Sequence, residues 1–260
     1  MKITFSKYQG AGNDFIMLNN FSGEYDHLSL EQINYLCDRK FGIGADGLIK
    51  INQSKIGAFE LDYYNSDGSK SFCGNGARCS VAFVEKLGLD VSNISFLAVD
   101  GEHQASKKGE LISLKMNDVN KIESIQEDFE LSTGSPHYVR FVENSIDLNV
   151  FEEGRKIRYS IDYKENGINV NFVEILTENE IEVATYERGV EDETLSCGTG
   201  VVASAIVYIK KMNALGQHEI IVHTKGGKLK VSFNHSSKDL FQDIYLIGPA
   251  IHVFDGIIEI

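Results

Sequence analysis

The stretch Cys73-Gly74-Asn75-Gly76 decides the fold, because it occurs nearly unchanged a second time as Cys197-Gly198-Thr199-Gly200. Each copy leads into an apolar, helix-like segment. The two cysteines are separated by close to half of the 260-residue chain, as expected if an ancestral unit was duplicated. We therefore predict two related halves whose thiols face each other, so that one can remove a proton from a carbon and the other can return one to its opposite side.

The composition is that of a globular protein with an acidic surface. Hydrophobic residues make up 42% of the chain, enough for sizeable cores, and the length allows one large or two modest domains. The formal charge of −13 would repel phosphate backbones and anionic lipids. We expect neither nucleic acid nor a membrane as a partner. Without a signal-like or membrane-spanning apolar run, the chain is predicted to be cytoplasmic.

The four cysteines are expected to be reduced thiols rather than disulfides, since nothing indicates secretion. Cys73 and Cys79 lie six residues apart without a second Cys or His pair at zinc-finger spacing, so we predict no metal site. Cys37 and Cys79 are expected to be buried as small hydrophobic residues.

Most of the chain alternates apolar and polar residues, a pattern typical of half-buried strands. Helical spacing occurs at residues 29–41 and after each cysteine motif, at 77–87 and 201–212. The pairs Lys108-Gly109 and Gly226-Gly227 indicate hairpins. The polar segment 117–123 is the predicted domain boundary. Strands are expected at 3–8, 15–18, 48–51, 59–64, 111–116, 138–142, 170–175, 181–186, 220–223, 229–233 and 244–247.

The residues of the two cysteine turns are suited to acid/base chemistry. A cysteine at a strand-to-helix turn lies near the positive end of the helix dipole, which stabilises a thiolate. Glycines at the second and fourth positions let backbone amides approach an anion such as a carboxylate. One such turn alone would favour a buried cysteine at a helix cap, but two matched turns favour acid/base chemistry at one α-carbon, which is epimerisation. No phosphate-binding loop or lysine context indicates pyridoxal phosphate, so no cofactor is expected.

These residues, with further motifs in the same order, resemble the diaminopimelate epimerase family over the whole chain. The resemblance rests on residues 7–15 (KYQGAGNDF), 42–47 (GIGADG), 64–69 (YNSDGS), 72–78 (FCGNGAR), 134–137 (GSPH), 169–172 (NVNF), 186–189 (YERG), 196–200 (SCGTG) and 248–250 (GPA).

The resemblance implies a cofactor-independent isomerase of lysine and peptidoglycan precursor synthesis that interconverts LL- and meso-diaminopimelate. It implies an α+β fold of two pseudo-repeated domains, each a β-barrel-like sheet around a central helix, with the active site between them. The domains would be 1–116 with the returning C-terminal strand 250–260, and 117–249. Relatives also imply a homodimer.

The resemblance also assigns roles to single residues. Cys73 and Cys197 would be the acid/base pair, with His137 and Glu187 as polar partners beside the thiols. The α-carboxylate of the small amino acid substrate would bind the amides of Gly74, Asn75, Gly198 and Thr199. Its distal amino acid end would bind Asn13, Asn65, Asn169 and Arg188, of which arginine suits a bidentate carboxylate contact.

Two positions depart from the family pattern. Ser135 stands where relatives commonly carry Asn, and Gly47 where some carry Gln, so we expect changed substrate contacts there. Three other functions stay open at this point: a proline or hydroxyproline racemase-like enzyme, a non-catalytic amino acid binding protein, and a thiol redox sensor.

Overall fold

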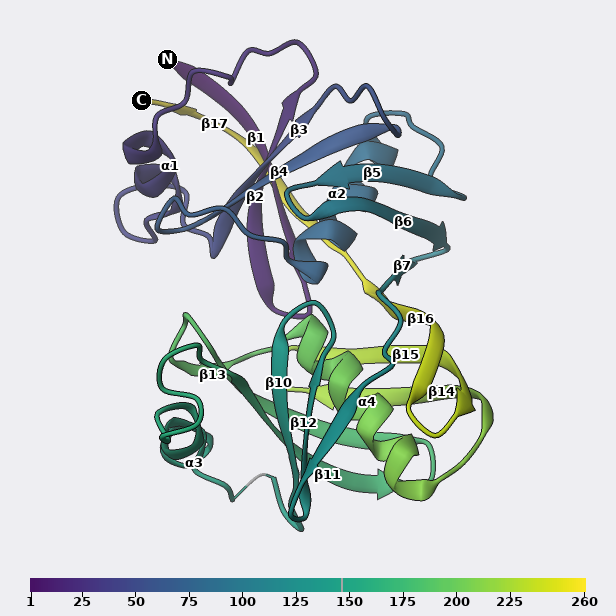
Figure 1. The fold of residues 1–260 in the computed structure, drawn as a ribbon. Coiled ribbons are helices and arrows are strands. Elements are labelled where there is room, and N and C mark those ends of the chain that lie inside the picture. Colours follow the sequence, from purple (N-terminus) through teal and green to yellow (C-terminus); the bar gives the residue numbers. More distant parts are fainter. Residues whose placement is uncertain (146) are drawn as a thin grey trace. The chain divides into compact units, whose positions relative to one another are not determined.

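The structure is a computed structural model that describes residues 1–145 and 147–260. It divides into two compact units (Figure 1). Unit 1 comprises Met1–Leu114 and Gly248–Ile260, and unit 2 comprises Lys115–Ile247. Each unit combines mixed β-sheet with a buried helix, which confirms the expected α+β class.

Unit 1 is a sheet that curves around helix α2 (Gly74–Lys86). The paired strands follow the order β17-β1-β2-β3-β4-β5-β6-β7, with parallel pairs only at β2–β3 and β4–β5. Helix α2 packs against β17 and β1 at one end of this order and against β6 near the other. The strands are β1 (Lys2–Gly10), β2 (Asn13–Asn20), β3 (Gly47–Asn52), β4 (Phe59–Asn65), β5 (Ile94–Ala98), β6 (Gly101–Lys108), β7 (Leu111–Lys115) and β17 (Ile251–Glu259).

Unit 2 repeats this arrangement around helix α4 (Gly198–Met212). Its strands pair in the order β8-β9-β10-β11-β12-β14-β15-β16, again with parallel pairs at the third and fifth junctions, β10–β11 and β12–β14. Strand β13 (Asp192–Thr194) adds a second partner to β12. The others are β8 (Ile122–Ile125), β9 (Asp128–Ser132), β10 (Pro136–Phe141), β11 (Asn169–Thr177), β12 (Glu180–Glu187), β14 (Gly216–Thr224), β15 (Gly227–Ser237) and β16 (Leu240–Pro249).

The two units therefore match strand by strand, which confirms the predicted internal repeat. Register makes the match residue-specific: Phe15 pairs with Gly47 across β2–β3, and His137 pairs with Asn169 across β10–β11. Phe15 is thus equivalent to His137, and Gly47 to Asn169. Two residues before Phe15 and His137 lie Asn13 and Ser135, which are therefore also equivalent. Each follows a glycine with positive φ.

Both central helices begin directly after a cysteine. Cys73 and Cys197 are the N-cap residues, with extended backbones. The helices are buried from Asn75 to Val84 and from Gly200 to Ile209, so they serve as the cores of their units. No helix in the described part of the chain is long and apolar enough to cross a membrane.

The two remaining helices each contribute buried residues to a hydrophobic core cluster of their unit. Helix α1 (Leu30–Cys37) begins at a capping box of Ser29 and Gln32 and is shorter than the predicted 29–41, because the Asp38 side chain binds the amides of Lys40 and Phe41 and ends it. Helix α3 (Val150–Arg158) was not predicted. Its central Gly154 weakens the helical signal, yet a Cβ there would lie 2.3 Å from Tyr186 Cβ.

Each predicted strand segment lies within or overlaps an observed strand, and both predicted hairpins form, between β6 and β7 and between β14 and β15. Strand β17 corresponds to the C-terminal strand 250–260 that the resemblance implied, whereas β5, β6, β8, β9 and β13 were not predicted. Several of these carry exposed or charged side chains at positions where alternation would require apolar ones, as in residues 101–108 (GEHQASKK).

Gly200→Ala should destabilise unit 2. A Cβ at this position would lie 2.3 Å from Asn171 Oδ1, so the helix or the strand must move. We expect the free energy of unfolding to fall by about 1–3 kcal/mol, the usual cost of overpacking. Ser204→Ala, one turn later, is the control: it removes a buried hydroxyl without a protein partner among the described residues and should be neutral or stabilising. Equal denaturation midpoints for both variants would contradict the close approach.

Candidate active site

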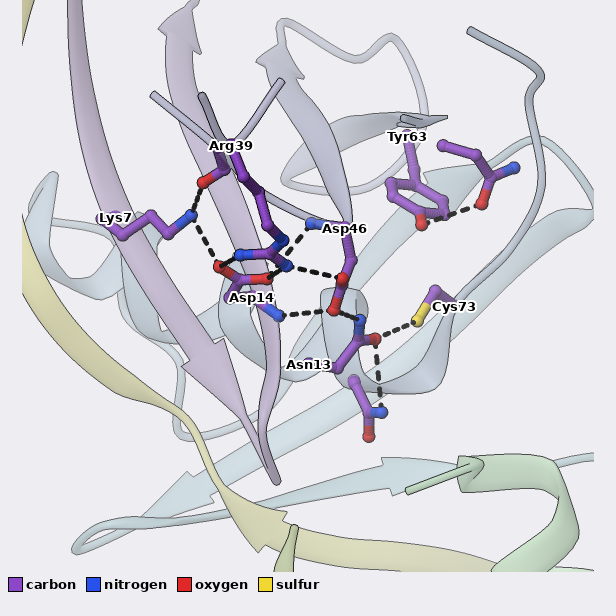
Figure 2. A network of polar contacts seen from close by, with 10 residues as sticks. Lys7, Asn13, Asp14, Arg39, Asp46, Tyr63 and Cys73 are labelled. Atoms are coloured by element: carbon purple, nitrogen blue, oxygen red, sulfur yellow. Dashed lines mark hydrogen bonds and ion pairs between the residues drawn. The ribbon is translucent and has the colours of Figure 1, made fainter. Parts of the chain in front are cut away.

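In unit 1, Cys73 lies beside the Asn13 side chain (Figure 2). Its Sγ is 3.4 Å from Asn13 Oδ1, which also accepts a hydrogen bond of 3.4 Å from Asn75 Nδ2. Asn13 begins β2, and Asn75 is in the first turn of α2. The structure thus brings together three of the residues expected at the site, with Gly74 between Cys73 and Asn75.

An ionic network fixes the Asn13 amide (Figure 2). Asn13 Nδ2 donates to Asp46 Oδ2 at 2.5 Å, and because a carboxylate only accepts, Asn13 Oδ1 must face Cys73. Arg39 binds Asp14 with both terminal nitrogens, at 3.1 and 2.7 Å, and Asp46 at 2.8 Å. Buried Lys7 completes the network at 2.7 Å from Asp14. Burial raises the pKa of Asp14, but Arg39 and Lys7 together lower it to about 2.

No role was predicted for Lys7, Asp14, Arg39 or Asp46 from the sequence. Lys7 and Asp14 stand in the first motif that carries the resemblance, and Asp46 in the second. These residues could have been predicted to support the site, because they stand in the same motifs as predicted site residues.

Arg78 is a fully buried cation next to the first cysteine turn. Its Nη2 donates to Asn75 Oδ1 at 2.7 Å, and its Nη1 to the Gly74 carbonyl at 3.5 Å. Burial lowers the pKa of Arg78, while the neighbouring Cys79 and Cys73 raise it. Arg78 therefore orients Asn75 and places positive charge near the turn.

Asn65, at the end of β4, is held by groups other than Cys73. Its Oδ1 accepts from Tyr63 Oη at 2.9 Å, and its Nδ2 donates to Ser69 and to Ser71 Oγ at 3.0 Å.

Gly47 is required by packing, because a Cβ there would lie 2.4 Å from both the Tyr63 ring and the Tyr64 carbonyl.

In unit 2, three expected residues form one chain of contacts. Cys197 Sγ is 3.5 Å from Thr199 Oγ1, and Thr199 Oγ1 is 2.8 Å from His137 Nε2. On its other side, His137 Nδ1 is 3.0 Å from Asn171 Nδ2. Asn171, which the sequence analysis missed, stands in the 169–172 motif two residues after Asn169.

His137 is fully buried. Burial, assisted by the positive charge of Arg188, lowers its pKa to about 3. The imidazole is therefore neutral at physiological pH.

Asn169 and Arg188 are bound to each other. Asn169 Oδ1 accepts from the Arg188 backbone N–H at 2.9 Å, and Asn169 Nδ2 donates to Ser135 Oγ at 2.5 Å. The guanidinium of exposed Arg188 donates to the Asn166 carbonyl at 2.9 Å. Half-buried Glu187 ends β12 directly before Arg188.

The other two cysteines are core residues, as predicted. Cys37 and Cys79 are 3% and 0% exposed. Burial raises the pKa of Cys37 to about 12 and that of Cys79 further, which makes both thiols unreactive. Among residues 1–145 and 147–260, no three His, Cys, Asp or Glu side chains are grouped as metal ligands.

Solved structures share this fold at low sequence identity. A phenazine biosynthesis protein of the PhzF family from Bacillus anthracis matches with a TM-score of 0.80 at 13% identity, over 100% of both chains. A hydroxyproline epimerase from Agrobacterium vitis matches with a TM-score of 0.68 at 11% identity, over 99% of this chain and 91% of that one. The fold and the repeated cysteine turns thus define the class: an α+β protein of two pseudo-repeated units.

Sequence comparison defines the family within that class. The sequence model described as Diaminopimelate epimerase matches residues 5–123 and 129–253. The diaminopimelate epimerase of Flavobacterium psychrophilum is 46% identical over 251 residues, 96% of this chain and 97% of that protein. That of Chlorobaculum tepidum is 38% identical over 263 residues, covering 96% and 99%. The chain belongs to the diaminopimelate epimerase family, and it is an isomerase with a small-molecule amino acid as substrate.

Asp14→Asn should destabilise the protein near neutral pH by about 2 kcal/mol, since its pKa is lowered from 3.8 to about 2. A lowered carboxyl pKa stabilises the fold above the unfolded value, and this stabilisation is lost as pH falls from about 4 to 2. Denaturant unfolding at pH 7 and at pH 2.5 measures the difference. Glu110→Gln, at an exposed hairpin, is the control without effect. A difference from wild type that is the same at both pH values would contradict the ionic network.

Proposed function

We propose that the protein interconverts LL- and meso-diaminopimelate by a two-thiol acid/base mechanism without a cofactor, in lysine and peptidoglycan precursor synthesis. The observation that carries the proposal is the repeated turn: the equivalent strands β4 and β12 precede Cys73 and Cys197 in the chain, and each cysteine caps a buried helix. Family membership supplies the substrate.

In this mechanism one cysteine, as thiolate, removes the α-proton while the other, as thiol, protonates the opposite face. The α-carboxylate binds the amides of Gly74, Asn75, Gly198 and Thr199. These are first-turn amides, which lack partners within a helix and lie at its positive end. The same charge stabilises the carbanion-like transition state, whose extra negative charge spreads onto the carboxylate.

The remaining predicted residues are assigned to binding and to support of the thiols. Asn13, Asn65, Asn169 and Arg188 would bind the distal amino acid end, and His137 and Glu187 would support the thiols. Exposed Arg188 is the best placed for a carboxylate, since within residues 1–145 and 147–260 its guanidinium donates to a single carbonyl, that of Asn166. The buried Asn169 would act chiefly by fixing the Arg188 backbone.

The catalytic residues suggest where the protein acts. A mechanism with two reduced thiols favours the reducing cytoplasm. The acidic charge of −13 disfavours nucleic acid and anionic membranes as partners.

We also propose a homodimer, formed through β17. Four large apolar side chains of this strand are about half exposed or more: Ile251 49%, Val253 53%, Phe254 46% and Ile257 69%. Exposed apolar side chains on a strand at the edge of a sheet favour association.

Replacing either catalytic cysteine should abolish epimerisation. Cys73→Ala and Cys197→Ala each remove one of two non-interchangeable groups, so kcat should fall by orders of magnitude while binding persists. Turnover of LL-diaminopimelate in D₂O should label the meso product first and leave recovered substrate unlabelled. Cys37→Ala, in the core, is the control that keeps activity. Turnover of D- or L-proline instead of diaminopimelate, or near-normal rates in Cys197→Ala, would refute the proposal.

Val253→Lys should convert the dimer into monomers, because a charge in an apolar interface lacks a partner. Light scattering during size-exclusion chromatography measures the mass. Ile161→Lys is the control, since Ile161 is 81% exposed elsewhere and should not alter it. A wild-type protein of 29 kDa by this measurement would rule out the dimer.

A further inference from the structure

The orientation of the Asn171 amide is fixed by its surroundings. Its Nδ2 donates to the Tyr138 carbonyl at 3.0 Å, and its Oδ1 accepts from Thr185 Oγ1 at 2.9 Å. A flipped amide would place its oxygen against the Tyr138 carbonyl oxygen, which cannot donate. The nitrogen therefore also faces His137 Nδ1 as a donor, at 3.0 Å.

This orientation determines the tautomer of His137. Because Asn171 donates to Nδ1, that nitrogen carries a lone pair, and the proton of the neutral ring is on Nε2. Two hydroxyls lie within reach of Nε2: Thr199 Oγ1 at 2.8 Å and Ser135 Oγ at 3.4 Å. The shorter contact takes the proton, so His137 donates to Thr199.

A hydroxyl that accepts from His137 keeps its own proton for another acceptor. The sulfur of Cys197 lies 3.5 Å from Thr199 Oγ1, within the range of a hydrogen bond to sulfur. Donation to sulfur stabilises a thiolate more than a thiol, because hydrogen bonds to charged acceptors are stronger. The direction of every bond from Asn171 to Cys197 thus follows from the first one.

Unit 1 shows that the fold does not require these polar groups. His137 is equivalent to Phe15, and Asn171 to Ile49, which follows two residues after Gly47. Near Gly76, unit 1 places the Ile49 and Phe15 side chains, whereas unit 2 places the Asn171 amide near Gly200. An apolar pair fills this position in one copy, so the polar pair in the other copy serves something besides packing.

We propose that Thr199 is a positioning residue whose hydroxyl donates to Cys197 and favours its thiolate, and that Asn171 and His137 set the direction of this donation. The proposal rests on the proposed function, in which Cys197 accepts a proton from an amino acid. Cys73 has the opposite kind of neighbour, since the Asn13 oxygen can only accept from it.

The pH dependence of alkylation by iodoacetamide, followed at Cys197 by mass spectrometry, tests the donation. In Thr199→Val the midpoint should rise by about one pH unit, the tenfold change in equilibrium that loss of a hydrogen bond to a charged group produces. Thr199→Ser keeps the hydroxyl and should restore the wild-type midpoint. Thr224→Val, at the β14–β15 turn, is the matched control without effect.

Other charged groups near the chain of contacts stay the same in all these variants. They are Arg188 and Glu187 at the end of β12, and the Glu193–Lys225 ion pair of 2.5 Å beside β13. A difference between Thr199→Val and Thr199→Ser therefore reports the hydroxyl. Equal midpoints in wild type, Thr199→Val and Thr199→Ser would overturn the proposal.

A second measurement is independent of any variant at Thr199. In protein labelled with ¹⁵N-histidine, His137 should show a protonated Nε2 and an unprotonated Nδ1 from pH 6 to 8, with the signal assigned by its loss in His137→Gln. A protonated Nδ1 would overturn the proposal. Neither readout uses epimerase activity, so a protein that passes both and fails to turn over diaminopimelate would refute only the proposed function.

Discussion

The structure depends on one constraint: a helix must begin in the interior of a curved sheet. Glycine permits this in both units, since a Cβ on Gly76 would lie 2.9 Å from Ile49 Cδ1 and one on Gly200 2.3 Å from Asn171 Oδ1. A helix that starts there points its first-turn amides, and the residue before them, away from the core it fills. The cysteine occupies that residue in both copies, so thiol and amides are presented by the same backbone.

The two units support the cysteine turn with different groups. Unit 1 surrounds Cys73 with amides whose directions are set by ions, Asp46 on Asn13 and Arg78 on Asn75. In unit 2 the groups that link Cys197 to Asn171 are neutral, Thr199 and a histidine that burial keeps uncharged. A duplicated scaffold thus holds two chemically unlike thiols, as a reaction needs when one side gives a proton and the other takes it.

The sequence was sufficient where a local pattern and the tertiary environment agree. The helices after Cys73 and Cys197 and strands such as β11 and β12 follow from spacing alone. It was insufficient where environment overrides pattern. Strand β6 is polar and α3 contains a glycine, so neither carries its usual signal. The roles of Asp46, Arg78 and Asn171 depend on contacts between segments far apart in the chain, which one sequence does not encode in any readable spacing.

The pairing of β1 with β17 has a consequence for synthesis. The second strand of this pair lies about 240 residues after the first, with Lys2 opposite Glu259. A nascent chain has all strands of unit 2 before β17 emerges, so the later half of the gene encodes the unit that can fold first. Before β17 pairs with β1, the unpaired edge of β1 can pair with other chains. A chaperone that covers this edge during translation would prevent such aggregation.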